Sequence, residues 1–177
     1  MQPTAAPRTA LVLHDQRAFP SIKPRPHQRW LILFSPGAQR RHTPFTMIKR
    51  IAACSCGELS ATVTGAPIRV SICHCTDCQR RTGSVFAAQA RFPKDAVQIA
   101  GSSTQYVRVD DEGWKKATFY FCPHCSAILY WQLEAEKEMI LIPVGAFADP
   151  GFPAPTVSVW EEDKHAWVSL PENIEHW

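Results

Sequence analysis

Residues 73–78 read Cys73-His74-Cys75-Thr76-Asp77-Cys78, which puts three thiols within six positions of the chain. A cysteine pair flanks this stretch on each side, in Cys54-Ser55-Cys56 and in Cys122-Pro123-His124-Cys125. All seven cysteines of the chain fall in these three clusters. Since seven is an odd number, a complete intrachain disulfide framework is impossible. The Cys-x-Cys and Cys-x-x-Cys spacings also suit metal ligands better than structural disulfides.

The composition is typical of one domain with an ordinary hydrophobic core. The chain has 177 residues, of which 45% are hydrophobic and 20% charged. No apolar run approaches the roughly 20 residues that a membrane-spanning helix needs. The apolar stretch 30–34 near the N-terminus is also too short for the core of a signal peptide. We therefore expect a cytoplasmic protein with reduced thiols and no membrane partner.

The charge is distributed unevenly along the chain. Residues 1–46 contain seven Lys or Arg and one acidic residue, whereas residues 47–177 contain 12 basic and 15 acidic residues. The net charge of +3 therefore combines a basic N-terminal segment with a mildly acidic remainder. Because nucleic-acid-binding domains carry a basic patch or stripe, the acidic remainder predicts no nucleic-acid partner.

Residues 1–46 form a proline- and arginine-rich segment without hydrophobic periodicity. Seven of the 15 prolines lie here and would interrupt any helix or strand. We expect a disordered extension, followed by one domain over residues 47–177. Translation starting at Met47 would make the segment an artefact, and a basic arm or transit peptide is the functional alternative.

From Ile48 onward the pattern is that of a mainly β domain. Apolar residues alternate with polar ones over short stretches, and no stretch has a long helical period. The expected strands cover residues 59–63, 68–72, 85–92, 97–99, 104–109, 114–121, 128–133, 139–144 and 156–160. We expect a hairpin loop at 110–113, a loop at 150–155, and a short helical turn over 79–83 that ends at Gly83.

The cysteine spacing suggests two zinc sites. Zinc prefers tetrahedral coordination, and a structural site has four protein ligands, whereas a catalytic site keeps one position open. The expected closed site consists of Cys54, Cys56, Cys122 and Cys125, and the expected open, catalytic site consists of Cys73, Cys75 and Cys78.

Other assignments of the cysteines remain open from the spacing alone. Cys75 and Cys78 could instead join Cys122 and Cys125 in a ribbon-like site. Iron–sulfur or redox use is a further alternative to zinc. His74 lies between two candidate ligands, and histidines in this position more often point outward than ligate. We expect His74, and likewise His124, to lie behind the ligands or in solvent.

Three thiolates would make the zinc ion a weak Lewis acid, because their charge already exceeds that of the ion. Lowering the pKa of a bound water is therefore not its natural task. Such an ion suits an incoming thiol, which it would hold as a nucleophilic thiolate. The expected partner is a thiol, and the expected acceptor is an electrophilic carbon.

These motifs also resemble a known family. Cys54-Ser55-Cys56-Gly57, Cys73 to Gly83 and Cys122-Pro123-His124-Cys125 are similar in order and spacing to the glutathione-dependent formaldehyde-activating family, which shares its domain with centromere protein V. The tail from Val159 to Trp167 looks like the family's C-terminal strand, so the likeness covers about residues 48–167.

The resemblance implies a zinc-stapled β-tent fold of short antiparallel strands with two zinc ions. It also implies the same division into a four-cysteine structural site and a three-cysteine catalytic site. The activity implied is a carbon–sulfur lyase reaction, in which glutathione and formaldehyde condense to S-hydroxymethylglutathione. One residue departs from the family pattern: Ser126 stands where the family usually has Gly, and a left-handed backbone there would be strained.

Several other residues have a possible role in the site. Arg81 is the expected contact for a carboxylate of glutathione, whereas Arg80 is expected to be a solvated charge. Asp77 and Thr82 could position a proton, but turn residues of these types more often cap backbone groups. Lys115 and Lys116 beside Trp114 look like an ordinary hairpin end. The aromatic residues expected in the core are Phe86, Phe92, Phe119, Phe121, Trp131 and Trp160.

Three function classes follow from these observations. They are an enzyme acting on thiol adducts of small aldehydes, a zinc-stapled binding module, and a redox or metal-handling protein. An open metal position beside a pocket would favour the enzyme over the binding module.

Overall fold

A computed structural model describes residues 48–109 and 116–177 of the chain. The expected disordered extension and the expected hairpin loop at 110–113 lie outside these residues, as does Trp114. Within the described residues, no helix is long and apolar enough to cross a membrane.

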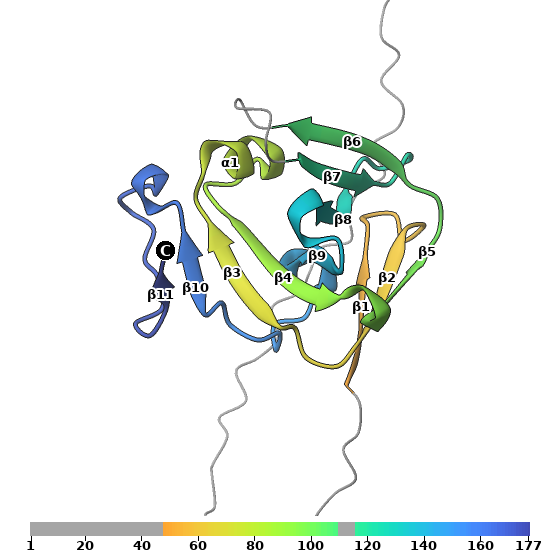
Figure 1. The fold of residues 1–177 in the computed structure, drawn as a ribbon, viewed down its shortest axis with the longest axis horizontal. Helices are drawn as coiled ribbons and strands as arrows, with labels where there is room; N and C mark the ends of the chain where they lie inside the picture. Colours follow the sequence, from red (N-terminus) through yellow and green to blue (C-terminus); the bar gives the residue numbers. More distant parts are fainter. Residues whose placement is uncertain (1–47, 110–115) are drawn as a thin grey trace, which may run out of the picture. The chain divides into compact units, whose positions relative to one another are not determined.

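The smaller of two sheets has three antiparallel strands in the order β1-β2-β5 (Figure 1). Its strands are β1 (Lys49–Ala53), β2 (Ser60–Thr64) and β5 (Val97–Ala100). In β2 the alternation seen in the sequence becomes real burial, since Ala61 and Val63 are fully buried while their neighbours are half-buried.

The larger sheet has eight strands in the order β11-β10-β3-β4-β9-β8-β7-β6 (Figure 1). They are β3 (Arg69–Cys73), β4 (Ala87–Pro93), β6 (Thr104–Val109), β7 (Lys116–Phe121), β8 (Ile128–Leu133), β9 (Met139–Pro143), β10 (Val157–Val159) and β11 (Glu175–His176). The α-helix α1 (Thr76–Thr82) follows β3, and 3-10 helices cover Lys94–Ala96, Glu134–Glu136, Val144–Phe147 and Glu161–Asp163.

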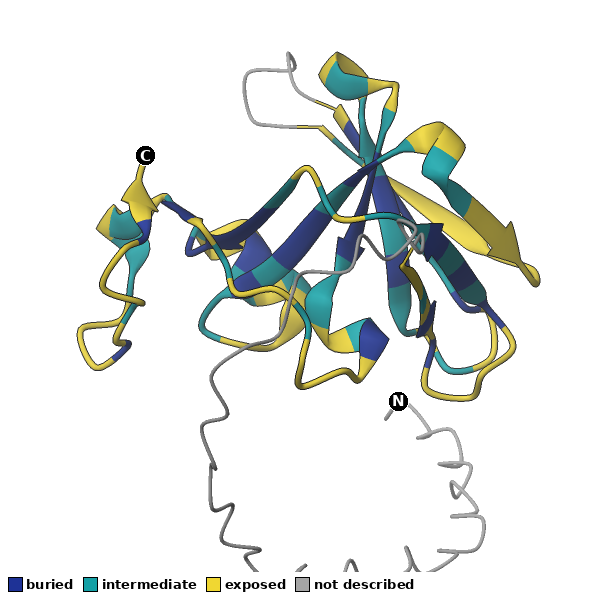
Figure 2. Cartoon of the chain, turned by 90° about the horizontal axis from the view of Figure 1, so that it is seen from below, coloured by how far each residue is buried: buried dark blue, intermediate teal, exposed yellow. Residues whose placement is uncertain are grey.

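The two faces of the larger sheet have different tasks. Successive side chains of a strand point to opposite faces. Val70 of β3, Phe92 of β4 and Ile142 of β9 belong to one buried cluster. The cluster also contains Val63 of β2 and Leu59, which directly precedes β2. Figure 2 shows that the buried residues lie mostly on the strands, whereas the loops and the strands β5 and β6 are largely exposed. The main core therefore lies on one face of the larger sheet.

The opposite face carries the polar residues of β3 and β4. Arg69, Ser71 and Cys73 alternate with the core residues of β3, and each faces a residue of β4 across the strand pair. Their partners are Arg91, Gln89 and Ala87 in that order. The strand β3 thus has one apolar face and one face of arginine, serine and cysteine. The polar face ends at Cys73, the first cysteine of the central cluster.

The mainly β fold predicted from the sequence is confirmed, and each predicted strand has a counterpart in the structure. Two strands were not predicted: β1, and β11, which follows the strand expected to be the last. The expected antiparallel pairing does not extend to one edge of the larger sheet, where β10 pairs in parallel with both β3 and β11. Parallel pairing needs a long connection between the strands, and local sequence patterns do not show where such a connection leads.

The helical turn begins three residues earlier than predicted. Cys75 is the N-cap of α1, because its sulfur accepts a hydrogen bond from the backbone N–H of Cys78 at 3.4 Å. The predicted end is confirmed: Gly83 has a φ of 66° and its N–H donates to the carbonyl of Gln79. A thiol replaces the usual Ser, Thr or Asp cap, and this is why the start was not recognised.

The aromatic residues divide into core and site. Phe92, Phe119 and Trp131 are buried as predicted, while Phe86 and Phe121 are half-buried. The prediction is wrong for Trp160, whose side chain is 51% exposed. Trp160 directly follows β10 and has a φ of 60°, so it has left the alternation of the strand.

Candidate metal centres and adjoining cavities

The central cluster brings Cys73, Cys75 and Cys78 together, with all three sulfurs within 4.8 Å of one another. Cys73 ends β3 on the polar face of the larger sheet, Cys75 caps α1, and Cys78 lies in the first turn of the helix. The sulfurs of Cys73 and Cys75 are 3.4 Å apart. The strand-to-helix transition is therefore what converts the Cys-x-Cys-x-x-Cys spacing into one compact site.

The donor set of this cluster fits a cation. Hydrogen bonds from Cys73 and Cys75, together with the nearby positive charge of Arg81, lower the pKa of Cys78 to about 2. The hydrogen bonds with Cys75 and Cys78 raise the pKa of Cys73. Three thiolates this close repel one another, so they need a bound cation to ionise together. Sulfurs that share one tetrahedral zinc ion stand about 3.8 Å apart, which is close to the spacing here.

The second cluster contains the other four cysteines, Cys54, Cys56, Cys122 and Cys125, whose sulfurs also lie within 4.8 Å of one another. The first pair follows β1 of the smaller sheet, and the second pair lies between β7 and β8 of the larger sheet. The sulfur of Cys56 is 3.5 Å from that of Cys54 and 3.6 Å from that of Cys122. This group therefore joins the two sheets, and the ribbon-like grouping with Cys75 and Cys78 does not occur.

Tight turns shape this second cluster. The N–H of Gly57 donates to the carbonyl of Cys54, and the N–H of Ser126 donates to the carbonyl of Cys122. Both turns end in a left-handed residue, with φ 83° at Gly57 and 58° at Ser126. The strained conformation expected at Ser126 is thus present. The backbone N–H of Leu59 also donates to the sulfur of Cys54, at 3.2 Å.

The two histidines inside the clusters differ. His124 is exposed, and its Nε2 is 3.2 Å from a carboxylate oxygen of Glu58, so it lies in solvent as expected. His74 is completely buried and contacts Phe86 edge to face, with the ring centroids 6.1 Å apart. Of the two positions expected for His74, behind the ligands or in solvent, its burial excludes the solvent position. Burial lowers its pKa, and neither ring nitrogen has a hydrogen-bond partner within the described residues.

Arg81 lies directly against the central cluster. Its Nη2 is 3.9 Å from the sulfur of Cys78. Its guanidinium carbon lies 4.5 Å from the ring centroid of Trp131 and 5.3 Å from that of Phe119, which holds the charge in place by cation–π contact. Arg80, one residue earlier, is exposed. The exposure of Arg80 agrees with the solvated charge expected there, and the expected contact of Arg81 with glutathione stays a prediction.

The side chains of Asp77 and Thr82 both make polar contacts with other protein groups. The Oγ1 of Thr82 accepts a hydrogen bond from the backbone N–H of Ser84 at 3.2 Å, as expected of a turn residue that caps a backbone N–H, and it also donates to the carbonyl of Cys78 at 2.8 Å. A carboxylate oxygen of Asp77 lies 3.3 Å from Nη1 of Arg108, which ties α1 to the edge strand β6.

Two cavities adjoin the central cluster. The nearer one has a volume of about 240 Å³ and includes the three cysteines in its wall. It extends along the polar face of the larger sheet, past Ser71 and Gln89 to Arg69 and Arg91. The Nε2 of Gln89 donates to the hydroxyl of Ser71 at 3.3 Å, and Arg91 forms an ion pair with Glu136 at 2.6 Å.

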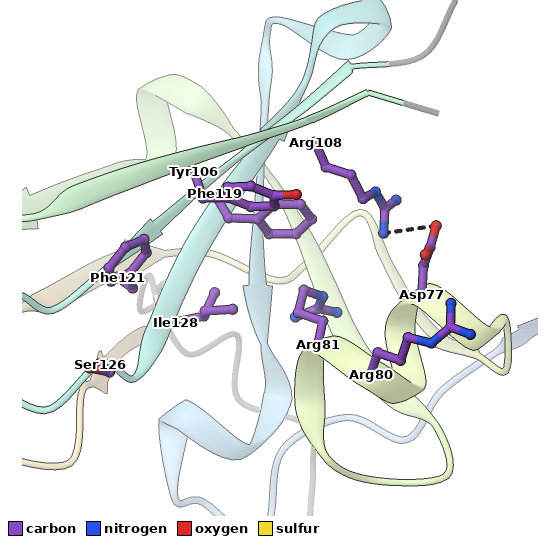
Figure 3. Close-up of a pocket in the computed structure, with 9 residues that line it drawn as sticks. All are labelled: Asp77, Arg80, Arg81, Tyr106, Arg108, Phe119, Phe121, Ser126 and Ile128. Carbon is purple, nitrogen blue, oxygen red and sulfur yellow. Dashed lines mark ion pairs between the residues drawn. The ribbon is translucent and has the colours of Figure 1, made fainter. Parts of the chain in front are cut away.

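The second cavity is larger, with a volume of about 550 Å³, and lies on the other side of Arg81 (Figure 3). Its lining consists of residues from α1, β6, β7, β8 and the turn before β8: Asp77, Arg80, Arg81, Tyr106, Arg108, Phe119, Phe121, Ser126 and Ile128. Arg81, Arg108 and Phe119 line both cavities, so the two spaces share a wall.

Sequence reasoning missed most of the residues that line the two cavities. Arg69, Arg91 and Arg108 are far apart in the chain and belong to no motif. One signal was present for Arg69: in β3 it shares a strand face with Ser71 and Cys73, at a period of two residues. Polar residues in alternation with a candidate ligand would have pointed to a functional face.

A family model described as "Glutathione-dependent formaldehyde-activating enzyme" matches residues 49–163, which contain all seven cysteines. The chain belongs to this glutathione-dependent formaldehyde-activating family. No curated protein matches the sequence. Among solved structures, a crystal structure of a Rhodobacter sphaeroides protein is similar, with 18% sequence identity and a TM-score of 0.43. That similarity covers 58% of this chain and 90% of the other.

Family membership and the geometry agree on the metal chemistry at a general level. Both cysteine groups are able to hold a metal ion, and their sulfur-only donor sets are of the kind that zinc accepts. In this member of the glutathione-dependent formaldehyde-activating family, the three-cysteine group faces a cavity, whereas none of the four other cysteines lines either of the two cavities described above.

Proposed function

We propose that this protein is a zinc-dependent carbon–sulfur lyase that joins glutathione to a small aldehyde, with formaldehyde giving S-hydroxymethylglutathione, and that also catalyses the reverse reaction. The observation that carries the proposal is the position of Cys73, Cys75 and Cys78. Their sulfurs converge at the wall of a cavity whose lining also includes four arginines, two uncharged polar residues and seven apolar residues. Membership of the family supports the same reaction class.

The proposed metal sites are a structural zinc held by Cys54, Cys56, Cys122 and Cys125, and a catalytic zinc held by Cys73, Cys75 and Cys78. When bound at the three-cysteine site, zinc supplies the positive charge that keeps a thiol sulfur in its thiolate form at neutral pH. The cavity on that side leaves room for a substrate sulfur beside the three cysteines.

The arginines of the chain are the proposed contacts for glutathione, which carries two carboxylates. Arg81 presents its charge next to the sulfur of Cys78 and is held rigidly against two aromatic rings. Arg69 lies further along the same cavity, with its guanidinium carbon 4.9 Å from the ring centroid of Trp177. Charge-assisted hydrogen bonds from such groups orient an anion as well as bind it.

The reaction needs little from the protein beyond orientation and a thiolate. The sulfur adds to the carbonyl carbon, the carbon–oxygen double bond becomes a single bond, and the oxygen takes up the proton that the thiol lost. Nothing is oxidised or reduced. Because thiols add to formaldehyde readily without a catalyst, the proposed acceleration comes from binding the two reactants together and from thiolate formation.

The proposed partners are therefore a small thiol and an aldehyde, in the cytoplasm, with neither nucleic acid nor membrane involved. Two observations support this: residues 47–177 carry more acidic than basic groups, and the seven cysteines are free thiols. The alternative is a zinc-binding interaction module with the same fold. The cavity beside the three cysteines favours the enzyme.

The test uses protein in which cobalt replaces zinc, because thiolate-to-cobalt absorption bands report on the ligand set. The four-cysteine site contributes a constant background. Adding glutathione is expected to intensify the bands, as a fourth sulfur joins the three-cysteine site. S-methylglutathione, which has no free thiol, is the matched control and should leave the spectrum unchanged. A spectrum indifferent to glutathione at full metal content would favour the interaction module.

A further inference from the structure

The larger cavity is not needed for formaldehyde. Formaldehyde has only two non-hydrogen atoms, whereas a cavity of about 550 Å³ lies well within the range of pockets that hold whole organic ligands, roughly 300–1,000 Å³. The cavity also shares three wall residues with the cavity that contains the cysteines. A cavity of this size next to the proposed reaction centre is large enough to bind an organic ligand.

The cavity has a charged end and an apolar end. Figure 3 shows Arg80, Arg81 and the Asp77–Arg108 ion pair on the side of α1, and on the opposite side Phe121 and Ile128, with Ser126 next to them. The charged end is the one near the cysteines, because Arg81 lies 3.9 Å from the sulfur of Cys78. A ligand that reacts at the cysteines would therefore extend its other end between Phe121 and Ile128.

The chemistry of the lining indicates which reactant this is. The polar groups of a peptide such as glutathione would lose hydrogen bonds against phenylalanine and isoleucine side chains. The smaller cavity also has apolar wall residues, but it offers that peptide the polar groups of Ser71, Gln89 and Arg69 as well. The apolar end thus suits the electrophile, provided that the electrophile has an apolar body.

We propose that the larger cavity binds the body of the aldehyde, so that the electrophile is an aromatic or branched aliphatic aldehyde rather than formaldehyde alone. The inference rests on the proposed function and specifies its substrate class. The carbonyl group lies at the Arg81 end, where the developing alkoxide meets a positive charge. The bonds change as they do with formaldehyde: a carbon–sulfur bond forms, the carbonyl π bond breaks, and the oxygen takes the proton released by the thiol.

The first test compares two aldehydes with the zinc-loaded protein. Exchange NMR measures how far the protein accelerates formation of the glutathione adduct, above the uncatalysed exchange, for formaldehyde and for phenylacetaldehyde. We expect acceleration of both, with the larger aldehyde favoured. Ile128→Trp narrows the apolar end. We expect it to lower the ratio of the acceleration with phenylacetaldehyde to the acceleration with formaldehyde by about tenfold or more, since methylene-sized changes in such pockets have effects of that order.

Two further variants make this comparison specific. Val107→Trp is the matched control, because Val107 is exposed on the same strand as Tyr106 but alternation directs it to the other face. The ratio should not change in this variant. Tyr106→Ala removes part of the cavity wall at a side chain that is 60% exposed, so folding is not at risk. It should lower the ratio in the same direction as Ile128→Trp.

The second test is a binding measurement that does not depend on turnover. Calorimetry compares S-benzylglutathione with S-methylglutathione. We expect the benzyl compound to bind about tenfold more tightly to the wild type, and Ile128→Trp to remove this preference. Equal affinities in the wild type would overturn the inference.

The outcomes separate the two proposals. Acceleration of formaldehyde alone, or an unchanged ratio in Ile128→Trp, would refute the larger aldehyde while leaving the lyase function intact. If neither aldehyde is accelerated, the lyase function fails, and the inference fails with it.

Discussion

Ser126 adopts a left-handed backbone conformation directly after Cys125, with a φ of 58°. This conformation costs a residue with a β-carbon about 1–2 kcal/mol, and glycine escapes this cost. Glycine also makes the unfolded chain more flexible, which favours unfolding by about 0.4–1 kcal/mol and offsets part of the relief of backbone strain. We expect Ser126→Gly to raise the free energy of unfolding by up to about 1 kcal/mol, measured by denaturant titration of the zinc-loaded protein.

Ser84→Gly provides the matched control, because Ser84 is a serine outside regular secondary structure that has a negative φ. It should be neutral or slightly destabilising. A loss of stability in Ser126→Gly would mean that the serine hydroxyl contributes more than the backbone strain costs.

Arg81 and Arg80 are neighbours in sequence but differ in surroundings, which makes them a useful pair. Arg81 packs on two aromatic rings beside the cysteines, and Arg80 is exposed. A hydrogen bond to a charged group contributes about 1.5–3 kcal/mol. We therefore expect Arg81→Gln to weaken glutathione binding about tenfold or more, and Arg80→Gln to weaken it much less, as measured by calorimetry.

The salt dependence checks the interpretation. The effect of Arg80→Gln should fade as ionic strength rises, because exposed charges are screened, whereas the effect of Arg81→Gln should persist. Equal losses in both variants would indicate a general effect of positive charge and not a specific contact of Arg81.

At the scale of elements, the two cysteine groups connect different parts of the fold. One joins the end of β1 to the turn between β7 and β8, and the other stays within β3 and the start of α1. Because a structural zinc contributes its binding free energy to folding, losing a ligand from the first group should affect the whole domain.

We expect Cys122→Ser to unfold or aggregate the protein, since Cys122 is fully buried in the core between the sheets. Cys78→Ser should leave a folded protein that holds the metal ion of the three-cysteine site less tightly. Circular dichroism and metal analysis of both variants provide the measurement. Equal loss of structure in the two variants would contradict the division into a structural and a catalytic site.

At the scale of the whole molecule, we expect residues 47–177 to fold alone. Residues 1–46 are rich in proline and lack hydrophobic periodicity, so they cannot bury enough apolar surface to offset the entropy of ordering them. Thermal unfolding of the full chain and of the chain shortened to 47–177 should therefore agree. A clearly lower midpoint after truncation would show that the N-terminal segment stabilises the domain.

The sequence by itself determined the local structure. Side-chain alternation is a local property, so it identified the strands from β2 to β10, and the left-handed preference of Gly83 identified the end of α1. The sequence also places Cys73, Cys75 and Cys78 within one short stretch of chain, but their spacing alone left open whether the three form one site.

The tertiary structure alone decided how distant segments meet. The grouping of Cys54 and Cys56 with Cys122 and Cys125 depends on how the two sheets pack, and spacing left other groupings open. The parallel pairing of β10 with β3 depends on the route of a long connection. The cavity between α1 and Ile128 depends on β6, β7 and β8 passing beside the helix. Cavities and pairings of this kind arise from contacts between residues far apart in the chain, which local patterns do not encode.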